Sequence, residues 1–495
     1  MDFNNIKSVH IIGIGGCACS GLAEFLNNKK FIVSGSEQKI RKDLDYLINS
    51  HIKISFNHDK NNLLLNSSYP SIVLYSPAVA SLNPNNPELL EAKNKNIPLM
   101  SWQTFLGEYL KSIGSIGILA SGSEGKGTTC GILSSILIGT YLDPLSIFGA
   151  KLKDKRINNP TNLYIGNGKS YILEGDEYNK NFQNYHPEIN ITINFQYEHP
   201  ETYKDFNDYK EAFYEYFLGM VGRKLLIFRA TDSLIQFTKD YNLKSSHEIV
   251  FFGDENMLKK VDKSYEKYLI KDMNTDLNGS QWKIVGENLN EDFFINSLPA
   301  YLIQNGTGAI ISSTKLGIPI NTIKDNLKNF LGMIRRFSIY KTKNGGVIIT
   351  DYGHSPESLN HIIEEIRTLF PNKRLHIIFQ PHLFSRTYNF FDEFIYALSK
   401  ADKTTLIEVY PARENRQDWI EKVSSYKIYE KLKNLGKISY YGGEAKDIIN
   451  IYDKIDENDI NCFIGAGDMD FYYQELFDKF ETKDFVSIPH PPFQN

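Results

Sequence analysis

The residues with the strongest chemical signal lie in the run 122–129, which reads GSEGKGTT. Glycines let a backbone wrap around a phosphate, a lysine supplies positive charge, and a threonine hydroxyl can reach Mg²⁺. An apolar stretch at 116–120 precedes the run and apolar residues at helical spacing follow it, which is the order that a phosphate-binding loop requires. The residue after the lysine is normally Thr or Ser, so the glycine found there leaves the hydroxyl to a later threonine. The candidate phosphate-binding residues are Gly122, Gly125, Lys126, Gly127, Thr128 and Thr129.

Carboxylates and a histidine follow two further apolar stretches, at 171–173 and 191–193. Carboxylate oxygens are the hard ligands that Mg²⁺ prefers, so an acidic strand end indicates a metal site. A single histidine is more often a surface or helix-capping residue, but one at the end of a neighbouring strand is a candidate ligand. The residues concerned are Glu174, Asp176 and Glu177 after the first stretch, and Glu198 and His199 after the second.

A second glycine turn lies near the N-terminus, where an apolar run at 9–12 leads into Gly13-Ile14-Gly15-Gly16. Such a turn between strand and helix directs backbone N–H groups at a phosphate. Glu37 lies 24 positions after Gly13, near the spacing of an acid that binds a ribose hydroxyl. The same turn is equally typical of close packing between a strand and a helix, so nucleotide binding and packing both stay open.

Strand-like runs alternate with helix-length stretches in three successive segments, which predicts an α/β protein with parallel sheets. At 495 residues the chain is too long for one hydrophobic core. We expect three domains: a Rossmann-like domain at 1–112, a central phosphate-loop domain at 113–328, and a Rossmann-like C-terminal domain at 329–495.

The composition is that of an ordinary globular protein, with 41% hydrophobic and 23% charged residues and a net charge of −4. No basic tail indicates nucleic acid, and no apolar run approaches the roughly 20 residues of a membrane helix. The four cysteines form no CxxC pair and are expected to be reduced. No signal segment is apparent, so we expect a cytoplasmic protein with no membrane insertion.

Several motifs together resemble the Mur ligases, the three-domain ATP-dependent enzymes that build the peptide of bacterial peptidoglycan. The resemblance covers roughly residues 8 to 475, with the motifs in family order. FQPHLFSRT and EVYPARE resemble the branch that joins L-alanine to UDP-N-acetylmuramate. The motifs are GxGGxxxSG from 13, GxxGK from 122, EGDEY from 174, NxxxEH from 194, FLGMIRRF from 330, DYGHSP from 351, FQPHLFSRT from 379, EVYPARE from 408 and GAGD from 465.

The resemblance implies a reaction in which ATP activates a carboxylate as an acyl phosphate and an incoming amine then displaces phosphate. Catalysis of this kind consists mainly of positioning and of neutralising phosphate charge with Lys and Mg²⁺. The three domains are expected to close around the substrates. The resemblance assigns UDP-sugar binding to Gly13, Gly15, Gly16, Ser20 and Glu37, and binding of the terminal ATP phosphates to Lys126. It assigns Mg²⁺ binding to Thr128, Glu174 and His199, nucleotide contacts to Arg336 and Asp351, and amino-acid placement to Tyr352, His354 and Arg386. The implied catalytic set is Lys126, His199, Arg336, His354 and Arg386.

Departures from the family pattern bear on the ATP site and the amino-acid pocket. The stretch 298–303 lacks a His-Asn pair that the family uses near adenine, and Leu302 and Ile303 lie within it. Leu383 replaces an arginine, which leaves Arg386 as the expected cation for the amino-acid carboxylate. The other departures are Ala18 for Gly, Glu124 for His, Gly127 for Thr or Ser, Thr350 for Asp and Ser355 for His.

Three alternatives stay open at this point. A sister ligase attaches a whole peptide to UDP-N-acetylmuramate during wall recycling, and it shares the motifs of the first two domains. A nicotinamide dehydrogenase could use the Gly13 turn, but it would leave Lys126 and the acidic strand end without a purpose. A catalytically impaired binding protein would account for the departures. The sequence leaves open whether the amine is L-alanine, glycine or L-serine, and it does not indicate the oligomeric state.

Overall fold

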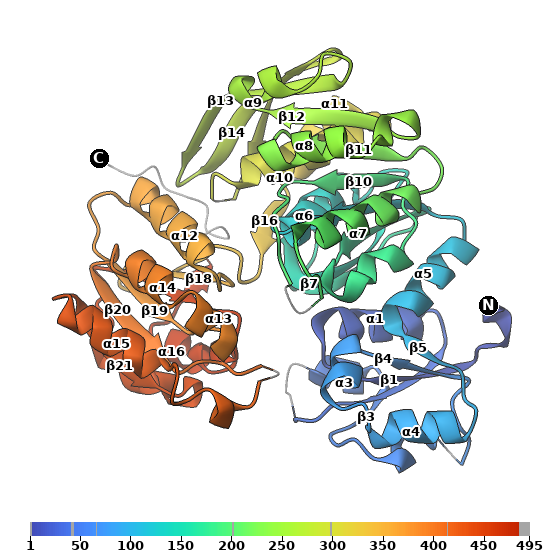
Figure 1. Ribbon diagram of the computed structural model, residues 1–495, viewed down its shortest axis with the longest axis horizontal. Coiled ribbons are helices and arrows are strands. Elements are labelled where there is room, and N and C mark those ends of the chain that lie inside the picture. Colours follow the sequence, from blue (N-terminus) through green and yellow to red (C-terminus); the bar gives the residue numbers. More distant parts are fainter. Residues whose placement is uncertain are drawn as a thin grey trace. The chain divides into compact units, whose positions relative to one another are not determined.

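The computed structural model describes residues 2–40, 44–65, 67–199, 202–297, 299–412 and 414–484. It contains three β-sheets flanked by helices, drawn blue, green and orange to red in Figure 1. The expected α/β class with three sheet-containing domains is confirmed. Within the described residues the chain forms two compact units, one of Met1–Asn274, Ser280–Ile295 and Tyr301–Met333, the other of Thr275–Gly279, Asn296–Ala300 and Ile334–Asn495.

The first sheet is parallel, with strand order β3-β2-β1-β4-β5. This is the order of a Rossmann-like sheet, in which ligands bind at the carboxyl ends of the strands where the order reverses. The glycine turn at 13–16 follows the central strand β1 at that point. The elements are β1 (Ser8–Ile12), α1 (Cys17–Asn28), β2 (Ile32–Ser36), α2 (Asp45–Asn49), β3 (Lys53–Ser55), η3 (Lys60–Leu63), β4 (Ile72–Tyr75), α3 (Pro77–Leu82), α4 (Pro87–Asn94), β5 (Leu99–Ser101) and α5 (Trp102–Ser112).

The second sheet has eleven strands, in the order β15-β14-β13-β12-β11-β10-β6-β9-β7-β16 with β8 beside β7. Its elements up to the middle of the sheet are β6 (Ile116–Ser121), α6 (Lys126–Leu137), β7 (Leu145–Asp154), β8 (Thr161–Ile165), β9 (Ser170–Gly175), η4 (Tyr178–Asn184), β10 (Ile189–Thr192), α7 (Phe206–Leu218), β11 (Leu225–Arg229) and α8 (Asp232–Asp240). The remainder are β12 (Glu248–Gly253), α9 (Glu255–Lys260), β13 (Glu266–Asp276), β14 (Gly279–Gly286), β15 (Leu289–Ile295), α10 (Leu302–Lys315), α11 (Ile320–Leu327) and β16 (Phe330–Met333).

Strand register brings the functional loops of the second sheet together. Ser121 at the end of β6 pairs with Gly175 of β9 on one side and with Thr192 of β10 on the other. All three strands are parallel, so the loops that follow them leave the same edge of the sheet. Strand β16 pairs with β7, so this sheet extends to Met333, past the boundary expected near 328. The exact domain limits stay a prediction.

The third sheet has the order β21-β20-β19-β22-β18-β17-β23 and is parallel at its centre. Its elements are β17 (Ser338–Lys341), β18 (Val347–Asp351), α12 (Pro356–Leu369), β19 (Leu375–Phe379), α13 (Phe384–Asn389), α14 (Phe391–Leu398), β20 (Lys403–Ile407), α15 (Ser425–Asn434), β21 (Ile438–Gly443), η7 (Ala445–Lys454), β22 (Ile460–Ile464), α16 (Tyr473–Lys479) and β23 (Lys483–Asp484).

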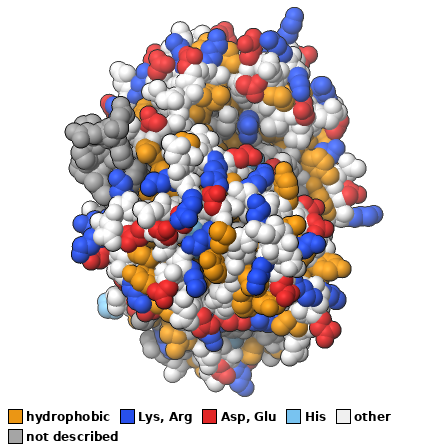
Figure 2. All heavy atoms as spheres, turned by 90° about the vertical axis from the view of Figure 1, so that its left-hand side faces the viewer, with side chains coloured by type: hydrophobic (Ala, Val, Ile, Leu, Met, Phe, Trp, Pro, Cys, Tyr) orange, Lys and Arg blue, Asp and Glu red, His pale blue; other side chains and the backbone are white. Residues whose placement is uncertain are grey.

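Side chains of β6 alternate between two cores, as the two-residue period of a strand requires. Ile118 and Ala120 join a core that contains α6 and α10, while Leu119 joins a second core on the opposite face. The described part of the chain contains no helix with the length and apolarity needed to cross a membrane. On the face drawn in Figure 2, acidic and basic side chains are interspersed.

An aromatic cluster supports the loops at the edge of the second sheet. Phe213 of α7 lies with its ring centroid 4.8 Å from that of Phe182 and 5.0 Å from that of Phe195. Phe195 lies between β10 and His199 in the chain, and Tyr203 in the same core donates a hydrogen bond to the carbonyl of Glu177. The cluster therefore fixes the backbone on both sides of the acidic and histidine residues.

Truncating the centre of this cluster should destabilise the protein. Phe213→Ala removes a fully buried ring and leaves a cavity, so we expect the free energy of unfolding to fall by about 3–5 kcal/mol. Chemical unfolding monitored by tryptophan fluorescence and circular dichroism measures the change. Leu218→Ala is the control, because Leu218 ends the same helix but is exposed, and its effect should stay within about 0.5 kcal/mol. Equal effects of the two variants would contradict the packing described.

Candidate functional site

The predicted phosphate loop connects β6 to α6. Gly122 and Gly125 adopt φ of 109° and 84°, a left-handed conformation that glycine adopts without steric cost. Lys126 is the first residue of α6, and its Nζ donates hydrogen bonds to the carbonyl oxygens of Gly122 at 2.6 Å and Ser123 at 3.3 Å. The ammonium group is thus folded back over its own loop, at the N-terminus of a helix.

Lys126 also forms an ion pair with a buried carboxylate. Its Nζ lies 2.9 Å from Oε1 of Glu177, and Nε2 of His199 lies 3.4 Å from the same oxygen. Burial opposes charge on both partners, but Glu177, Glu198 and Asp176 raise the pKa of Lys126 above its ordinary value. Burial likewise opposes ionisation of Glu177, yet Lys126 and His199 bring the pKa of Glu177 below its ordinary value. The lysine and Glu177 are therefore both ionised in the folded protein.

A third group joins this pair and makes a candidate cation site. Ligand atoms of Glu177, Glu198 and His199 all lie within 4.8 Å of one another. Burial and the neighbouring charge of Glu177 raise the pKa of Glu198 to about 7, although Lys126 and His199 act in the opposite direction. Oε2 of Glu177 is buried and has no hydrogen-bond partner among the described residues. The donor set fits a divalent cation, which would separate the crowded carboxylates.

Glu174 lies outside the group formed by Glu177, Glu198 and His199 and has a hydrogen-bond partner of its own. Its Oε1 accepts a hydrogen bond from the N–H of Gly149 at 2.6 Å. A Cβ atom built on Gly127 or on Gly149 would lie 3.1 Å from the same oxygen. The glycine after the phosphate-loop lysine therefore leaves space that the Glu174 carboxylate fills. Whether Thr128 and Glu174 bind Mg²⁺ stays a prediction.

The two threonines of the loop are buried at the start of α6, with Thr128 4% and Thr129 0% exposed. The Thr129 hydroxyl has no hydrogen-bond partner among the described residues. A residue that the sequence did not single out completes this region. Asn305 on α10 is buried, and its Oδ1 would lie 2.8 Å from a Cβ on Gly125. The sequence signal was available as a polar residue within an apolar helix.

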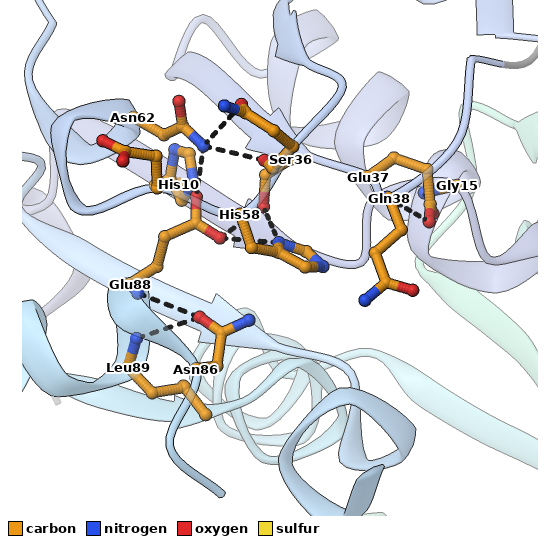
Figure 3. Close-up of polar contacts among 12 residues, drawn as sticks. His10, Gly15, Ser36, Glu37, Gln38, His58, Asn62, Asn86, Glu88 and Leu89 are labelled. Atoms are coloured by element: carbon orange, nitrogen blue, oxygen red, sulfur yellow. Dashed lines mark hydrogen bonds and ion pairs between the residues drawn. The ribbon is translucent and has the colours of Figure 1, made fainter. Parts of the chain in front are cut away.

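The N-terminal turn also has its own internal partner. Glu37 follows β2, and its Oε2 accepts a hydrogen bond from the N–H of Gly15 at 3.0 Å (Figure 3). Gly13 adopts φ of 79° and donates its N–H to the carbonyl of Ser36. Gly16 caps the N-terminus of α1. The structure thus brings the predicted acid directly onto the predicted turn.

Ser20 is buried in α1, where its side chain contacts β8 of the second sheet. Its Oγ donates to the carbonyl of Cys17 at 2.9 Å and accepts from Nδ2 of Asn162 at 2.9 Å. These contacts fasten α1 to β8 within the same unit. A direct role of Ser20 in substrate binding stays a prediction, while its role in joining the two elements is evident.

In the C-terminal unit the two adjacent arginines differ. Arg335 donates to Oδ2 of Asp470 at 2.6 Å and to the carbonyl of Gly465 at 2.7 Å, whereas Arg336 is exposed. Both guanidinium groups lie over the Tyr352 ring, at 4.9 and 5.0 Å from its centroid. Arg335 therefore organises the fold, and Arg336 is accessible to a ligand.

Asp351 ends β18 and fastens two turns. Its oxygens accept the N–H groups of Phe337 and Gly353, each at 2.7 Å. Burial raises the pKa of Asp351, while Arg336 and the two backbone hydrogen bonds oppose the increase. The carboxylate thus holds the segment after Arg336 against the start of the 353–355 turn. Its assignment to nucleotide binding stays a prediction.

His354 and Arg386 lie in one cluster with His382. The ring centroids of His354 and His382 are 6.0 Å apart, and a guanidinium nitrogen of Arg386 lies 3.4 Å from Nδ1 of His382. Arginine only donates, so Nδ1 of His382 accepts. Burial and then the charge of Arg386 lower the pKa of His354 to about 3, so His354 is neutral. The structure brings these predicted residues together with Tyr352, whose ring centroid is 5.6 Å from that of His354.

Several departures from the family pattern have structural explanations. Leu302 and Ile303 belong to the central core, and Ser355 caps α12 by accepting the N–H of Ser358. Leu383 is buried with φ of 67° at the start of α13, where its N–H is donated to the carbonyl of Tyr410. Leu298 of the stretch 298–303 and Arg413 of the EVYPARE motif lie outside the described residues.

Three family models match successive parts of the chain. They are described as "Mur ligase family, catalytic domain" for residues 8–113, "Mur ligase middle domain" for 120–313, and "Mur ligase, glutamate ligase domain" for 335–467. Curated relatives include the UDP-N-acetylmuramate–L-alanine ligase of Aquifex aeolicus, 30% identical over 477 residues covering 95% of this chain and 97% of the relative. That of Clostridium kluyveri is 32% identical over 480 residues, covering 96% and 99%.

Solved structures give the same picture of the fold. A UDP-N-acetylmuramate-alanine ligase from Thermotoga maritima has a TM-score of 0.77 at 22% identity and covers 96% of this chain and 99% of its own. A murein peptide ligase from Psychrobacter arcticus has a TM-score of 0.69 at 18% identity and covers 98% of this chain and 100% of its own.

The buried ion pair predicts a coupled effect on stability. Lys126→Met leaves the Glu177 carboxylate without its main cation, so the free energy of unfolding should fall by about 3–5 kcal/mol. Adding Glu177→Gln removes the uncompensated charge and should restore much of the loss. Chemical unfolding of Lys126→Met, Glu177→Gln and the double variant, compared with the wild type, forms a double-mutant cycle that measures the coupling.

The exposed ion pair between Lys260 and Asp232, at 2.8 Å, supplies the control. Lys260→Met should change the free energy of unfolding by less than about 1 kcal/mol. Strictly additive effects of Lys126→Met and Glu177→Gln would show that the two buried side chains are not energetically coupled.

Proposed function

The chain belongs to the Mur ligase family, and from that premise we propose that it uses ATP to join L-alanine to the carboxyl group of UDP-N-acetylmuramate. The observation that carries the proposal is the convergence of the phosphate-loop lysine, Glu177 and His199 at one sheet edge. The relatives cited above bear the name of that activity and align with nearly the whole chain.

The central region has the features that a bound nucleoside triphosphate and a divalent cation need. The glycine loop presents backbone N–H groups at a helix N-terminus, which favours a phosphate. Lys126 is charged and can exchange its contact with Glu177 for a phosphate oxygen. Glu177, Glu198 and His199 would hold a cation, which would supply positive charge against the phosphates.

The residues of this chain contribute mainly position and charge. Lys126 would neutralise charge as the terminal phosphate passes from ATP to the substrate carboxylate, which forms the acyl phosphate. The amine of L-alanine then attacks the acyl carbon, and phosphate leaves. Arg386 would pair with the carboxylate of the amino acid, and neutral His354 beside it would accept a hydrogen bond from the amine. Glu37 and the Gly13 turn would bind the sugar nucleotide.

Product formation tests the proposal directly. Purified protein is incubated with UDP-N-acetylmuramate, ATP and Mg²⁺ plus L-alanine, glycine or L-serine, and ADP and the coupled product are quantified. We expect turnover that depends on the amino acid, fastest with L-alanine. Lys126→Ala should abolish it, because the transition state loses its main protein cation. A further reaction with the tripeptide L-alanyl-γ-D-glutamyl-meso-diaminopimelate tests the recycling activity. Turnover with the tripeptide alone would show that the substrate amine is this peptide and not a single amino acid.

Mg²⁺ dependence distinguishes two candidate sets of metal ligands, one of Thr128, Glu174 and His199 and the other of Glu177, Glu198 and His199. His199→Ala should raise the Mg²⁺ concentration for half-maximal activity by at least about tenfold, because His199 belongs to both sets. Glu198→Gln should do the same if the cation lies at Glu177, Glu198 and His199, and Glu174→Gln if it lies beside the phosphate loop. Glu215→Gln, on exposed α7 surface, is the control. Unchanged Mg²⁺ dependence in His199→Ala would remove His199 from the site.

The amino-acid site is expected to be weak because Leu383 stands where the family has a second arginine. A charged hydrogen bond contributes about 1.5–3 kcal/mol, and each 1.4 kcal/mol is about tenfold in affinity. We therefore expect a high KM for L-alanine, lowered about tenfold by Leu383→Arg with the KM for ATP unchanged. Arg386→Ala should raise the KM for L-alanine further or stop turnover.

Leu383→Met is the matched control, since it keeps the volume and the apolar character of a buried side chain. Steady-state kinetics with L-alanine as the varied substrate compare the three variants. Tight L-alanine binding by the wild type, impaired by Leu383→Arg, would assign the carboxylate to another group and leave the ligase proposal intact.

A further inference from the structure

A buried polar cluster lies at the end of β2, beside the N-terminal glycine turn (Figure 3). Its centre is Glu88, which is fully buried in the first turn of α4. Oε1 of Glu88 lies 3.2 Å from Nε2 of His10 and 3.0 Å from Nδ2 of Asn62. Oε2 accepts from Oγ of Ser36 at 2.7 Å and from Nδ1 of His58 at 2.8 Å. All four partners come from different segments of the first domain.

The cluster is not accounted for by stability alone. A buried carboxylate is costly unless its oxygens are fully hydrogen-bonded, and apolar residues of similar volume often give equal or greater stability. Burial opposes ionisation of Glu88, but hydrogen bonds from His10 and His58 lower its pKa to about 2. Asn86 fixes the helix end by accepting the N–H groups of Glu88 and Leu89. The Glu88 carboxylate is therefore ionised, and its orientation is fixed.

Ser36 connects this charge to the glycine turn. Its hydroxyl donates a hydrogen bond to Oε2 of Glu88, and its carbonyl accepts the N–H groups of Gly13 at 2.9 Å and Ile14 at 3.1 Å. The next residue is Glu37, which accepts the N–H of Gly15. Ser36 thus binds the buried Glu88 through its side chain and the first N–H groups of the turn through its backbone carbonyl.

A hydrolytic triad of Ser36, His58 and Glu88 does not fit this geometry. A carboxylate only accepts, so the Ser36 hydroxyl and Nδ1–H of His58 both donate to Oε2 of Glu88. Nδ1 of His58 therefore carries a proton and cannot take one from Ser36, which would need it as a base. Ser36 is also fully buried and out of reach of a substrate.

We propose that Glu88 is a positioning residue for the sugar nucleotide, acting through Ser36 to hold Glu37 and the glycine turn in the arrangement that binds it. The proposal rests on the proposed function for the identity of that ligand, UDP-N-acetylmuramate. Glu88 does not touch the ligand. It acts by preorganisation, because a strand end that is already fixed loses no further freedom when the ligand binds.

The test compares Glu88→Gln, Ser36→Ala and the double variant. Each should raise the KM for UDP-N-acetylmuramate about tenfold, with kcat and the KM values for ATP and L-alanine unchanged. Because Glu88 acts through Ser36, the double variant should be no worse than Glu88→Gln alone. Glu91→Gln is the control, since Glu91 lies on the same helix and its carboxylate forms a hydrogen bond with Tyr69 and an ion pair with Lys95.

Binding of UDP alone, measured by isothermal titration calorimetry, separates this inference from the proposed function. Weaker UDP binding by Glu88→Gln and Ser36→Ala, with wild-type affinity in Glu91→Gln, supports the inference even if no amino acid is coupled. Unchanged UDP affinity in both variants overturns it, even if the wild type is an active ligase. An equal rise in all three KM values also overturns it, because a general loss of structure would produce that result. If Glu88→Gln fails to fold, Ser36→Ala carries the test, because it removes a single hydroxyl.

Discussion

The buried ion pair of Lys126 and Glu177 is the interaction on which the central site depends. It connects the loop after β6 to the loop after β9, and the same carboxylate oxygen faces His199 beyond β10. Three loops from adjacent parallel strands are thereby held by one charge. A phosphate must displace this carboxylate and two backbone carbonyls to reach the lysine. A highly charged ligand with its own cation meets that requirement better than a weak anion does.

The two glycine turns of the larger unit share a principle. Each lies between a central strand and a helix, and each is contacted by a charged side chain, acidic at the first turn and basic at the second. Glu37 accepts an N–H from the first turn, while Lys126 donates to the carbonyls of the second. Each of these two side chains is held by a buried carboxylate. Lys126 binds Glu177 directly, whereas Glu37 follows Ser36, whose hydroxyl binds Glu88. The turns are thus held in shape without relying on their ligands.

Local pattern was sufficient to predict the α/β class and the strand, glycine loop and helix around Lys126, because each depends on residues near one another in sequence. It predicted a ligand role for Glu37 but not the hydrogen bond that Glu37 accepts from Gly15. It did not distinguish Glu177 from Glu174 as the partner of Lys126, since which carboxylate turns inward depends on where β9 ends. Arg335 and Arg336 are adjacent and chemically identical, and what separates them is tertiary: Arg335, at positive φ, binds Asp470, whereas Arg336 is exposed. Asn305 reaches the phosphate loop from 180 positions away in the chain.

The space shared by Gly127, Gly149 and Glu174 makes substitutions at the two glycines interdependent. A side chain at either glycine would start 3.1 Å from the same carboxylate oxygen, so these positions are sterically linked. A threonine at 127 would require the Glu174 carboxylate to shift slightly, and that carboxylate also accepts the N–H of Gly149. The effect of a substitution at 127 therefore depends on which residue stands at 149, because both side chains would press on the Glu174 carboxylate.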